Sequence, residues 1–341
     1  MGITERLLAP SAGDLAGLQQ LVVDSHWNQL AADWEVFLRA GTVHVVRDGG
    51  GRIVASGAVL PMGASEVAWI SMILVTPARR GAGLGRAVFG QCLAQVQAEG
   101  RIAMLDATPA GEALYAQFGF RAQWRLGRWR REGAGERRWR NAGLSLALQR
   151  QPTGEARRRQ PAGEALQRQP TGEARRRQPA GEALQRQPAG EALQRQPAGE
   201  ALQRQPAGEA LRALMELDER ALGFDRSGLI AQLADRPGSR CIADADAAAL
   251  VRDGRTARHI GPLLARSESA AVRLLQDMLD AEDATLLVDL RDDRPLLRGA
   301  LEAAGFRHER PFARMALPAP GQVLPAGDGA LLHAVAGPEF A

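Results

Sequence analysis

Apolar residues in the first 120 positions follow two different spacings. Short, nearly continuous apolar runs are typical of strands, whereas apolar residues that recur every three or four positions are typical of a helix with one buried face. The runs predict strands over 3–8, 43–47, 53–60, 69–75 and 102–107, and the helical spacing predicts helices over 15–22, 33–38, 88–96 and 109–118. Strands and helices therefore alternate along the first third of the chain.

A glycine-rich loop joins the strand 69–75 to the helix 88–96. It contains Arg80, Gly81, Gly83 and Gly85. Glycines let backbone N–H groups come close to a ligand, and the start of a helix carries unpaired donors and partial positive charge. The loop therefore predicts a seat for a phosphate or pyrophosphate. Its spacing differs from the dinucleotide pattern G-x-G-x-x-G, and the absence of a following Lys excludes a Walker loop. A strand–helix turn without a ligand stays open as an alternative.

A second helix start follows the strand 102–107. Thr108 is a favoured N-cap residue and Pro109 a favoured first helical residue. The helix ends in Leu-Tyr-Ala-Gln-Phe-Gly-Phe, residues 114–120, with Gly119 at the position of a C-cap glycine. Tyr115 is the only tyrosine of the chain.

These two motifs together resemble those of the GNAT superfamily of N-acyltransferases. Residues 75–85 have the form Val-x-Pro-x-x-Arg-x-x-Gly-x-Gly, which is similar to the acyl-CoA-binding signature of that family. Residues 114–120 are similar to the end of the GNAT helix whose Tyr protonates the leaving CoA thiolate. The resemblance implies an acetyl-CoA-dependent N-acetyltransferase that moves an acetyl group to the amine of a small molecule by direct attack. Tyr115 would be the general acid, acetyl-CoA the co-substrate, and no metal is implied.

The resemblance also implies a set of cofactor-binding residues. Backbone groups of the strand end would pair with the pantetheine arm, and the glycine loop would hold the pyrophosphate. The set comprises Ile73, Leu74, Val75, Arg80, Gly81, Ala82, Gly83, Leu84, Gly85, Arg86 and Thr108. At Thr108 the family often has Asn, so the contact expected there departs from the family pattern.

The second half of the chain repeats the layout of the first without its chemistry. Strands are predicted over 248–252 and 285–290, a further strand is expected to end at Pro262, and a helix is predicted over 267–279. Residues 301–306 parallel 115–120, but Leu301 replaces the Tyr, and Ala-Arg-Ser-Glu-Ser-Ala (265–270) replaces the glycine loop. The strings at 218–226, 310–315 and 336–340 resemble the second domain of a bacterial GNAT subfamily.

We therefore expect an α/β (α+β) fold of two tandem GNAT-like domains, each a mixed twisted sheet flanked by helices. Residues 1–142 would form the catalytic domain, 143–150 the first strand of the second domain, and 205–341 the rest of that non-catalytic domain. Residues 151–204 are six copies of a nine-residue repeat. Each copy contains Pro and Gly and at most one Leu, which predicts a disordered insertion.

Charge and composition narrow the possible partners. The formal charge is +4, and residues 151–212, with 11 Arg and 7 Glu, account for all of it. The rest of the chain is balanced, which argues against a polyanion partner. Arginines interleaved with Trp124, Trp129 and Trp139 could stack on single-stranded nucleic acid. A solvated hairpin with aromatics on one face is the alternative, and the resemblance implies strands here, so nucleic acid is not expected. Two cysteines, no signal core and no long apolar run predict a cytoplasmic protein without a membrane span. The oligomeric state is not predicted.

The acceptor side is predicted less sharply. The resemblance places His26, Trp27, Asn28, Gln29 and Asp33 beside the acceptor groove, where they could orient an amine by stacking and hydrogen bonds. Alternatively, Trp27 and Trp34 only pack helices together. The general base stays open between His26, Asp33, Glu66 and a water chain. Two other functions stay open: a non-catalytic acyl-CoA-binding or sensing protein, and an Arg-rich interaction module carried by the repeat.

Overall fold

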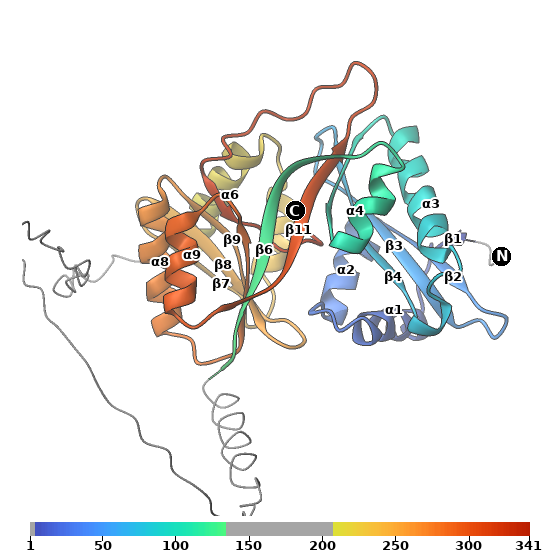
Figure 1. Ribbon diagram of the computed structural model, residues 1–341, viewed down its shortest axis with the longest axis horizontal. Helices are drawn as coiled ribbons and strands as arrows, with labels where there is room; N and C mark the ends of the chain where they lie inside the picture. The colour runs from blue at the N-terminus through green and yellow to red at the C-terminus, as the bar shows by residue number, and fades with distance from the viewer. Residues whose placement is uncertain (1–3, 134–206) are drawn as a thin grey trace, which may run out of the picture. The chain divides into compact units, whose positions relative to one another are not determined.

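The structure is a computed structural model that describes residues 4–133 and 207–341 (Figure 1). Contacts divide the chain into two units, and the described residues all belong to the first, which comprises 1–141 and 203–341. The predicted strand Leu144–Leu148 and the repeat at 151–204 lie outside the described residues.

The described part of the first half contains six strands, four α-helices and a 3-10 turn. The strands are β1 (Thr4–Arg6), β2 (Thr42–Arg47), β3 (Ile53–Pro61), β4 (Val67–Val75), β5 (Ile102–Ala107) and β6 (Arg121–Arg131). The helices are α1 (Ala12–Asp24), α2 (Ala31–Ala40), α3 (Leu84–Ala98) and α4 (Pro109–Ala116), and the 3-10 turn η1 is Pro77–Arg79. The strands and helices predicted from residue spacing in this half are confirmed.

The second half repeats this order. Its strands are β7 (Arg240–Ala243), β8 (Ala247–Arg252), β9 (Arg258–Ala265), β10 (Leu286–Arg291), β11 (Arg307–Leu317) and β12 (Leu332–Ala334). Its helices are α6 (Ala207–Leu222), α7 (Ser227–Ala234), α8 (Glu268–Asp280) and α9 (Pro295–Ala303). One expectation is wrong: β9 does not end at Pro262 but continues to Ala265. Only Arg266 and Ser267 then connect it to α8, so this half has no counterpart of the long loop between β4 and α3.

Helices cover both faces of the sheet, which explains the continuous apolar strands. Neighbouring residues of a strand point to opposite faces. Val45 packs in the cluster that holds the apolar faces of α1 and α2, whereas Val46 packs in the cluster that holds α3 and Tyr115. Because both faces of β2 are buried, its apolar residues run without a break instead of alternating with polar ones.

The two halves share strands across their junction. The described strands form one sheet in the order β1-β2-β3-β4-β5-β11-β6-β10-β12-β9-β8-β7. Strand β11 of the second half therefore pairs with β5 of the first, and β6 of the first half pairs with β10 of the second. Figure 1 shows β6 and β11 crossing the middle of this unit side by side. For residues 121–131, the strand that the family resemblance implies is confirmed, and because β6 is an internal strand the alternative of a solvated hairpin is wrong.

Two buried ion pairs hold the exchanged strands. Arg128 of β6 donates two hydrogen bonds, each 2.8 Å long, to the carboxylate of Asp289 on β10. Arg314 of β11 makes the same bidentate contact, again 2.8 and 2.8 Å, with Asp106 on β5. Each pair joins an exchanged strand of one half to the neighbouring strand of the other, and all four side chains are buried.

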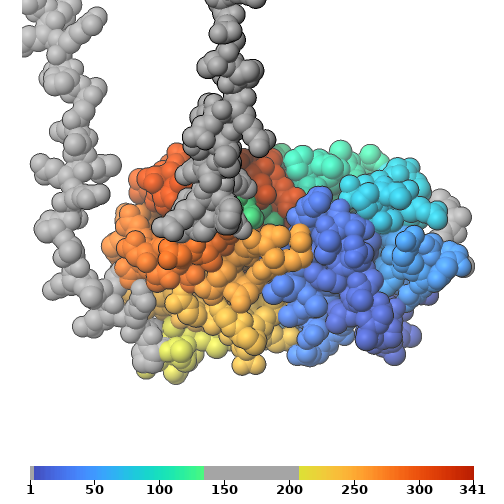
Figure 2. All heavy atoms as spheres, turned by 90° about the horizontal axis from the view of Figure 1, so that it is seen from below, coloured from blue at the N-terminus to red at the C-terminus, as the bar shows by residue number. Residues whose placement is uncertain are grey.

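A loop-to-loop contact also joins the two halves. The Asn28 side chain accepts hydrogen bonds from the backbone N–H groups of Thr256 and Ala257, at 2.9 and 3.0 Å, and donates one to the Ala257 carbonyl at 2.9 Å. In the view of Figure 2, light-orange atoms of the second half pack directly against the blue atoms of the first. The halves therefore meet through side chains as well as through the sheet.

Candidate active site

Strands β4 and β5 separate in the middle of the first half. They pair in parallel only from Val67 to Trp69, opposite Ile102 to Met104. The register of β4 against β3 shifts between Ser71 and Leu74, and Met72 in this bulge has a φ of 55°. A bulge bends a strand and breaks its ladder. Beyond Trp69, the end of β4 therefore diverges from β5 and leaves a cleft between the two strands.

The glycine loop leads from this diverging strand into α3. Gly81 and Gly83 both have a φ of 78°, a left-handed conformation that favours glycine. Gly83 is the N-cap of α3 and supplies no side-chain acceptor. A Cβ at Gly81 or Gly83 would meet nothing within 4 Å, so the space above the loop is open. The first N–H groups of α3 can therefore receive an anion.

The equivalent helix start in the second half is filled by its own side chains. Ser267 caps α8 by accepting a hydrogen bond from the Ala270 N–H at 3.2 Å. Glu268 lies in the first turn and accepts a hydrogen bond from the Leu297 N–H at 2.9 Å. The connection from β9 has only two residues, and the Glu268 carboxylate already lies at the helix start. The start of α8 therefore offers no comparable seat for a phosphate.

Tyr115 lies on the other side of the cleft. Helix α4 begins as predicted, with Thr108 accepting a hydrogen bond from the Gly111 N–H at 3.3 Å and Pro109 in the first turn. The Tyr115 ring packs on Phe89 with 4.4 Å between ring centroids. Burial raises the pKa of Tyr115 well above its usual value of 10. The phenol is therefore protonated at neutral pH and can give a proton to a stronger base.

We call the cleft that contains Tyr115 the active-site cleft. It is lined from the first half by Trp27, Gln29, Ser71, Ile73, Thr108 and Tyr115, among others. The remaining lining comes from β6, β11 and residues 336–340, and consists of Arg128, Arg310, Phe312, Pro338 and Glu339. The cleft therefore combines the predicted acid with side chains from the second half.

Comparison with known proteins gives the family. Models of acetyltransferase (GNAT) domains match residues 39–122 and residues 214–324, together more than half of the chain. The chain belongs to the GNAT acetyltransferase family. It carries a second, C-terminal GNAT-like domain, and GNAT domains of this kind transfer acetyl groups from acyl-CoA.

Solved structures agree with this fold over nearly the whole chain. A candidate acetyltransferase from Pyrococcus horikoshii is similar over 99% of this chain and 96% of its own, with a TM-score of 0.64 and 16% identity. A GCN5-related N-acetyltransferase from Sphaerobacter thermophilus aligns over 95% and 98%, with a TM-score of 0.54 and 15% identity. A tandem GNAT protein from the clavulanic acid biosynthesis pathway aligns over 94% and 100%, with a TM-score of 0.56 and 16% identity. A search of curated protein sequences gave no match.

The residues predicted for the acceptor side of this GNAT protein have different surroundings. Trp27 and Gln29 line the active-site cleft. His26 lies in a neighbouring hollow, and all the side-chain hydrogen bonds of Asn28 go to residues 256 and 257. Asp33 is fully buried, accepts a 2.6 Å bond from Arg236 and caps the start of α2.

The other predicted residues are also placed. Glu66 is exposed in the turn between β3 and β4, away from the cleft lining. Trp34 is fully buried in the core beside Phe37. Of the predicted cofactor residues, Ile73 and Thr108 line the cleft with Tyr115. Arg86, in the first turn of α3, lies over the Phe118 ring at 5.1 Å, and Arg80 donates to the Val75 carbonyl at 3.2 Å.

Sequence reasoning did not single out several side chains of the cleft, among them Ser71, Arg310 and Glu339. Glu339 is the carboxylate that lies closest to the end of the chain. It is 4% exposed, and its Oε1 accepts a 2.6 Å hydrogen bond from Arg252. Burial by itself would raise the pKa of Glu339, but Arg252 holds it below its usual value. A Cβ on Gly337 would come within 2.8 Å of both carboxylate oxygens, so the turn at 337 requires glycine. The string at 336–340 resembles the second domain of the GNAT subfamily, but that resemblance assigns no role to Glu339.

Two further findings concern metal ligands and membrane-spanning helices. In the ranges 4–133 and 207–341, no group of three or more His, Cys, Asp or Glu side chains is placed to hold a metal ion. None of the helices within the same ranges is both long and apolar enough to cross a membrane.

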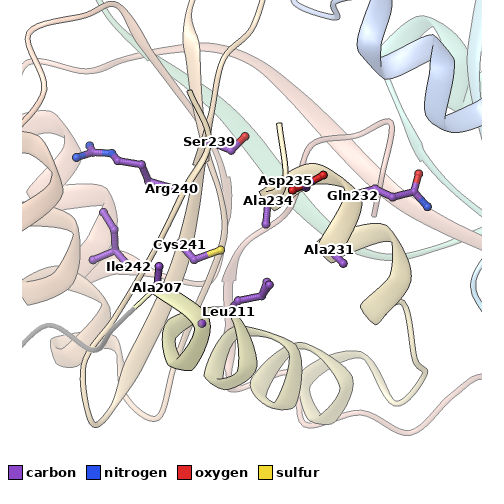
Figure 3. Close-up of a pocket in the computed structure, with 11 residues that line it drawn as sticks. Ala207, Leu211, Ala231, Gln232, Ala234, Asp235, Ser239, Arg240, Cys241 and Ile242 are labelled. Atoms are coloured by element: carbon purple, nitrogen blue, oxygen red, sulfur yellow. The ribbon is translucent and has the colours of Figure 1, made fainter. Parts of the chain in front are cut away.

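A second hollow lies at the far end of the sheet order, beside strand β7 (Figure 3). Leu211 of α6, Ala234 of α7 and Cys241 of β7 face one another across it. Burial raises the pKa of the Cys241 thiol to about 11, so this sulfur is not a thiolate at neutral pH. In the first half, the corresponding outer strand β2 is paired with β1, whereas β7 is the last described strand on its side.

Proposed function

We propose that the first GNAT domain transfers an acetyl group from acetyl-CoA to the primary amine of a small molecule. One observation carries the proposal: Tyr115 lines the cleft where β4 and β5 diverge, and the same strand β4 leads through the glycine loop into the uncapped start of α3. An anion seat and a proton donor joined by one strand match the two charged parts of the reaction, the pyrophosphate of CoA and its leaving thiolate.

Each part of the site then has a role. The loop from Arg80 to Arg86 would hold the pyrophosphate, and the backbone of Ile73, Leu74 and Val75 would pair with the pantetheine arm. The neutral amine nitrogen attacks the thioester carbonyl, a C–N bond forms and the C–S bond breaks. The departing thiolate takes the proton of Tyr115, while the amine proton passes to a base. His26 and a water chain stay candidates for that base, whereas Glu66 lies outside the cleft lining and Asp33 is buried against Arg236.

The second GNAT-like domain is proposed to be non-catalytic. Its α8 start is capped by Ser267 and carries Glu268, and the tyrosine position is Leu301. Since it lacks both the anion seat and the acid, one acetyl-CoA is expected per chain.

Acetyl-CoA binding tests the loop. Gly83→Glu should abolish binding measured by calorimetry, because it adds bulk and negative charge at the seat. Gly83→Asn is the conformational control, since Asn tolerates the left-handed region, and it should bind more tightly than Gly83→Glu. The matched control Ser269→Glu puts the same charge on the exposed start of α8 and should leave binding unchanged. Equal affinity in Gly83→Glu, with the fold intact, would remove the loop from the proposal.

CoA release tests the chemistry. The intact protein with acetyl-CoA and a panel of primary amines should release CoA thiol in proportion to acetylated product. Tight acetyl-CoA binding without CoA release across the panel would favour the alternative of a non-catalytic sensing protein.

A further inference from the structure

Three buried oxygen atoms of the active-site cleft lack hydrogen-bond partners in the described part of the chain. They are Oε2 of Glu339, Oε1 of Gln29 and Oγ of Ser71. Their side chains are only 4%, 4% and 8% exposed, and all three line the same cleft as Tyr115. A buried polar atom without a partner destabilises the folded protein, so a ligand that donates to these atoms would gain affinity.

The group that fits three acceptors is a primary ammonium. It offers three N–H donors and no acceptor, and its positive charge matches the Glu339 carboxylate. Arg252 occupies only the Oε1 side of that carboxylate, at 2.6 Å. Trp27 also lines the cleft, and an aromatic face attracts a cation.

Contacts from both halves hold the segment that carries Glu339 in a fixed position. Trp69 of β4 donates to the Pro338 carbonyl at 3.0 Å, and Arg252 of β8 donates to the Ala336 carbonyl at 2.8 Å. Phe340 stacks on Phe37 of α2 with 5.4 Å between ring centroids, a separation typical of aromatic pairs. A carboxylate held this firmly is preorganised for one ligand position.

An arginine without a carboxylate partner among the described residues lies in the same cleft, with its guanidinium over the Phe312 ring at 5.3 Å. Arg310 of β11 is partly buried, its Nε has no hydrogen-bond partner, and it forms no ion pair with any described carboxylate. Burial, followed by the nearby Arg128, lowers the pKa of Arg310. Arg128 lines the cleft too, but its charge is already balanced by Asp289. An anionic group on the ligand would balance the charge of Arg310.

The cleft continues toward a cationic surface. Arg128 and Arg310 also line the neighbouring hollow, together with Arg130, Arg255 and the carboxylate Glu309. Arg128 and Arg130 have carboxylate partners in Asp289 and Glu132. The remaining surplus of arginine over glutamate in this hollow favours the approach of an anionic acceptor.

We propose that the acceptor is a small primary amine that also carries an anionic group, a carboxylate or a phosphate. Glu339, Gln29 and Ser71 bind its ammonium, and Arg310 binds its anionic group. This rests on the acetyl transfer proposed above for the first domain. It gives the second GNAT-like domain a defined part in the site, because Arg310 and Glu339 both come from it.

Matched pairs of acceptors test the anion. β-Alanine and β-alaninamide differ in the carboxylate, and phosphoethanolamine and ethanolamine differ in the phosphate. CoA release is measured with each, and calorimetry measures binding of the same compounds to the CoA-loaded protein. The intact protein should prefer the anionic member of at least one pair by about 10-fold or more in kcat/KM or Kd. The pair with the larger preference identifies carboxylate or phosphate.

Substitutions assign the preference to residues. Arg310→Gln should reduce the preference for the anionic amine about 10–100-fold, mainly by raising its KM, and leave kcat/KM for neutral amines almost unchanged. The control Arg307→Gln removes an exposed arginine from the same strand, outside both hollows, and should change nothing. Glu339→Gln should raise KM for every amine by about 10–100-fold and leave acetyl-CoA affinity close to that of the wild type. Because it also removes the counter-charge of the buried Arg252, its thermal unfolding midpoint should fall, and its kinetics are measured well below that midpoint.

Two results would overturn the inference while the proposed acetyl transfer stands: neutral amines that react as well as their anionic partners, or an Arg310→Gln variant that weakens both members of a pair equally. Failure of every anionic amine to bind the CoA-loaded protein would also overturn it. By contrast, a wild-type protein that does not bind acetyl-CoA would overturn the proposed function itself.

Discussion

Replacing Tyr115 with Phe removes one oxygen atom and nothing else from the active-site cleft. The Tyr115 side chain is 9% exposed, and its hydroxyl makes no hydrogen bond to another described residue. Deleting a hydroxyl that has no protein partner should change the free energy of unfolding by no more than about 1 kcal/mol. The ring contact with Phe89 at 4.4 Å is kept.

The effect on catalysis should be much larger than the effect on stability. If the hydroxyl protonates the CoA thiolate, turnover should fall about 10²–10⁴-fold, which corresponds to about 3–5 kcal/mol of transition-state stabilisation. Acetyl-CoA affinity should stay similar, because the anion seat lies at the start of α3. The residual rate reflects protonation of the thiolate by water.

The pH dependence gives an independent check on the acid. Burial raises the pKa of Tyr115 above its usual 10, so the protonated form persists at pH values where a free tyrosine would ionise. Turnover of the wild type should therefore show no loss from tyrosine ionisation up to about pH 10. A decline centred well below that value would have to come from another group.

The measurement is single-turnover acetyl transfer, so that the chemical step is observed. Phe118→Leu serves as the packing control: it changes an aromatic contact of Phe89 without removing a hydroxyl, and should cost about 1 kcal/mol of stability with turnover kept. A Tyr115→Phe protein with full single-turnover rate would refute the role of Tyr115 as acid.

Three further predictions follow from the exchanged strands and from the segments outside the described residues. Asp289→Asn should lower the free energy of unfolding in urea by about 3–5 kcal/mol, because it leaves Arg128 buried without its counter-charge. Burial alone would raise the pKa of Asp289, but Arg128 and His259 hold it well below the usual range. The stability that the wild-type pair contributes is therefore present above pH about 4 and is lost as the pH falls. Deleting residues 151–204 should leave a folded, active protein that is equally stable or up to about 1–3 kcal/mol more stable by denaturant titration, since closing a long loop costs only the logarithm of its length; loss of folding would show that the repeat is structural. Leu146→Asp should lower the thermal midpoint if 144–148 is the first strand of the second domain, with β7 as its partner, and an unchanged midpoint would count against that assignment.

The elements of the fold could be predicted because burial on both faces leaves a local signature. Val45 and Val46 are neighbours in the sequence, yet they pack in different core clusters on opposite faces of β2. Such a strand has no polar face, so its apolar run stands out. The caps of α4 and α8 are equally local, since Thr108 and Ser267 bond to N–H groups three residues away.

The exchange of strands could not be predicted because its determinants are distant in sequence. Arg128 lies in a run of arginines that suggests a solvated surface, and its partner Asp289 is 161 residues away. Nothing local distinguishes an arginine with a buried partner from an exposed one. The wrong end of β9 has the same cause. Pro77 and Pro262 lie at similar sequence distances from Gly119 and Gly305, but the end of β9 depends on its pairing with β8, and that pairing extends to Ala265 of β9.

Separation along the sequence also decides which residues of the candidate site could be predicted. Gly83 and Tyr115 belong to short motifs whose chemistry depends on neighbours in sequence, so spacing alone indicated them. Glu339 is separated from Tyr115 by most of the chain, and only the sheet order brings β11 and residues 336–340 to the same cleft.

The arrangement also suggests why a second domain without the cofactor chemistry keeps its fold. Strand β5 pairs with β11 of the second half, so a strand from the second half completes the sheet beside the first. Arg314 neutralises the buried Asp106 of β5 from that strand, while Arg310, four residues earlier, lines the active-site cleft. A change that disrupted β11 would therefore leave a charge uncompensated in the first domain and remove a proposed substrate contact together. Ser267 and Glu268, which fill the start of α8, bond within the second half and leave both of these contacts intact.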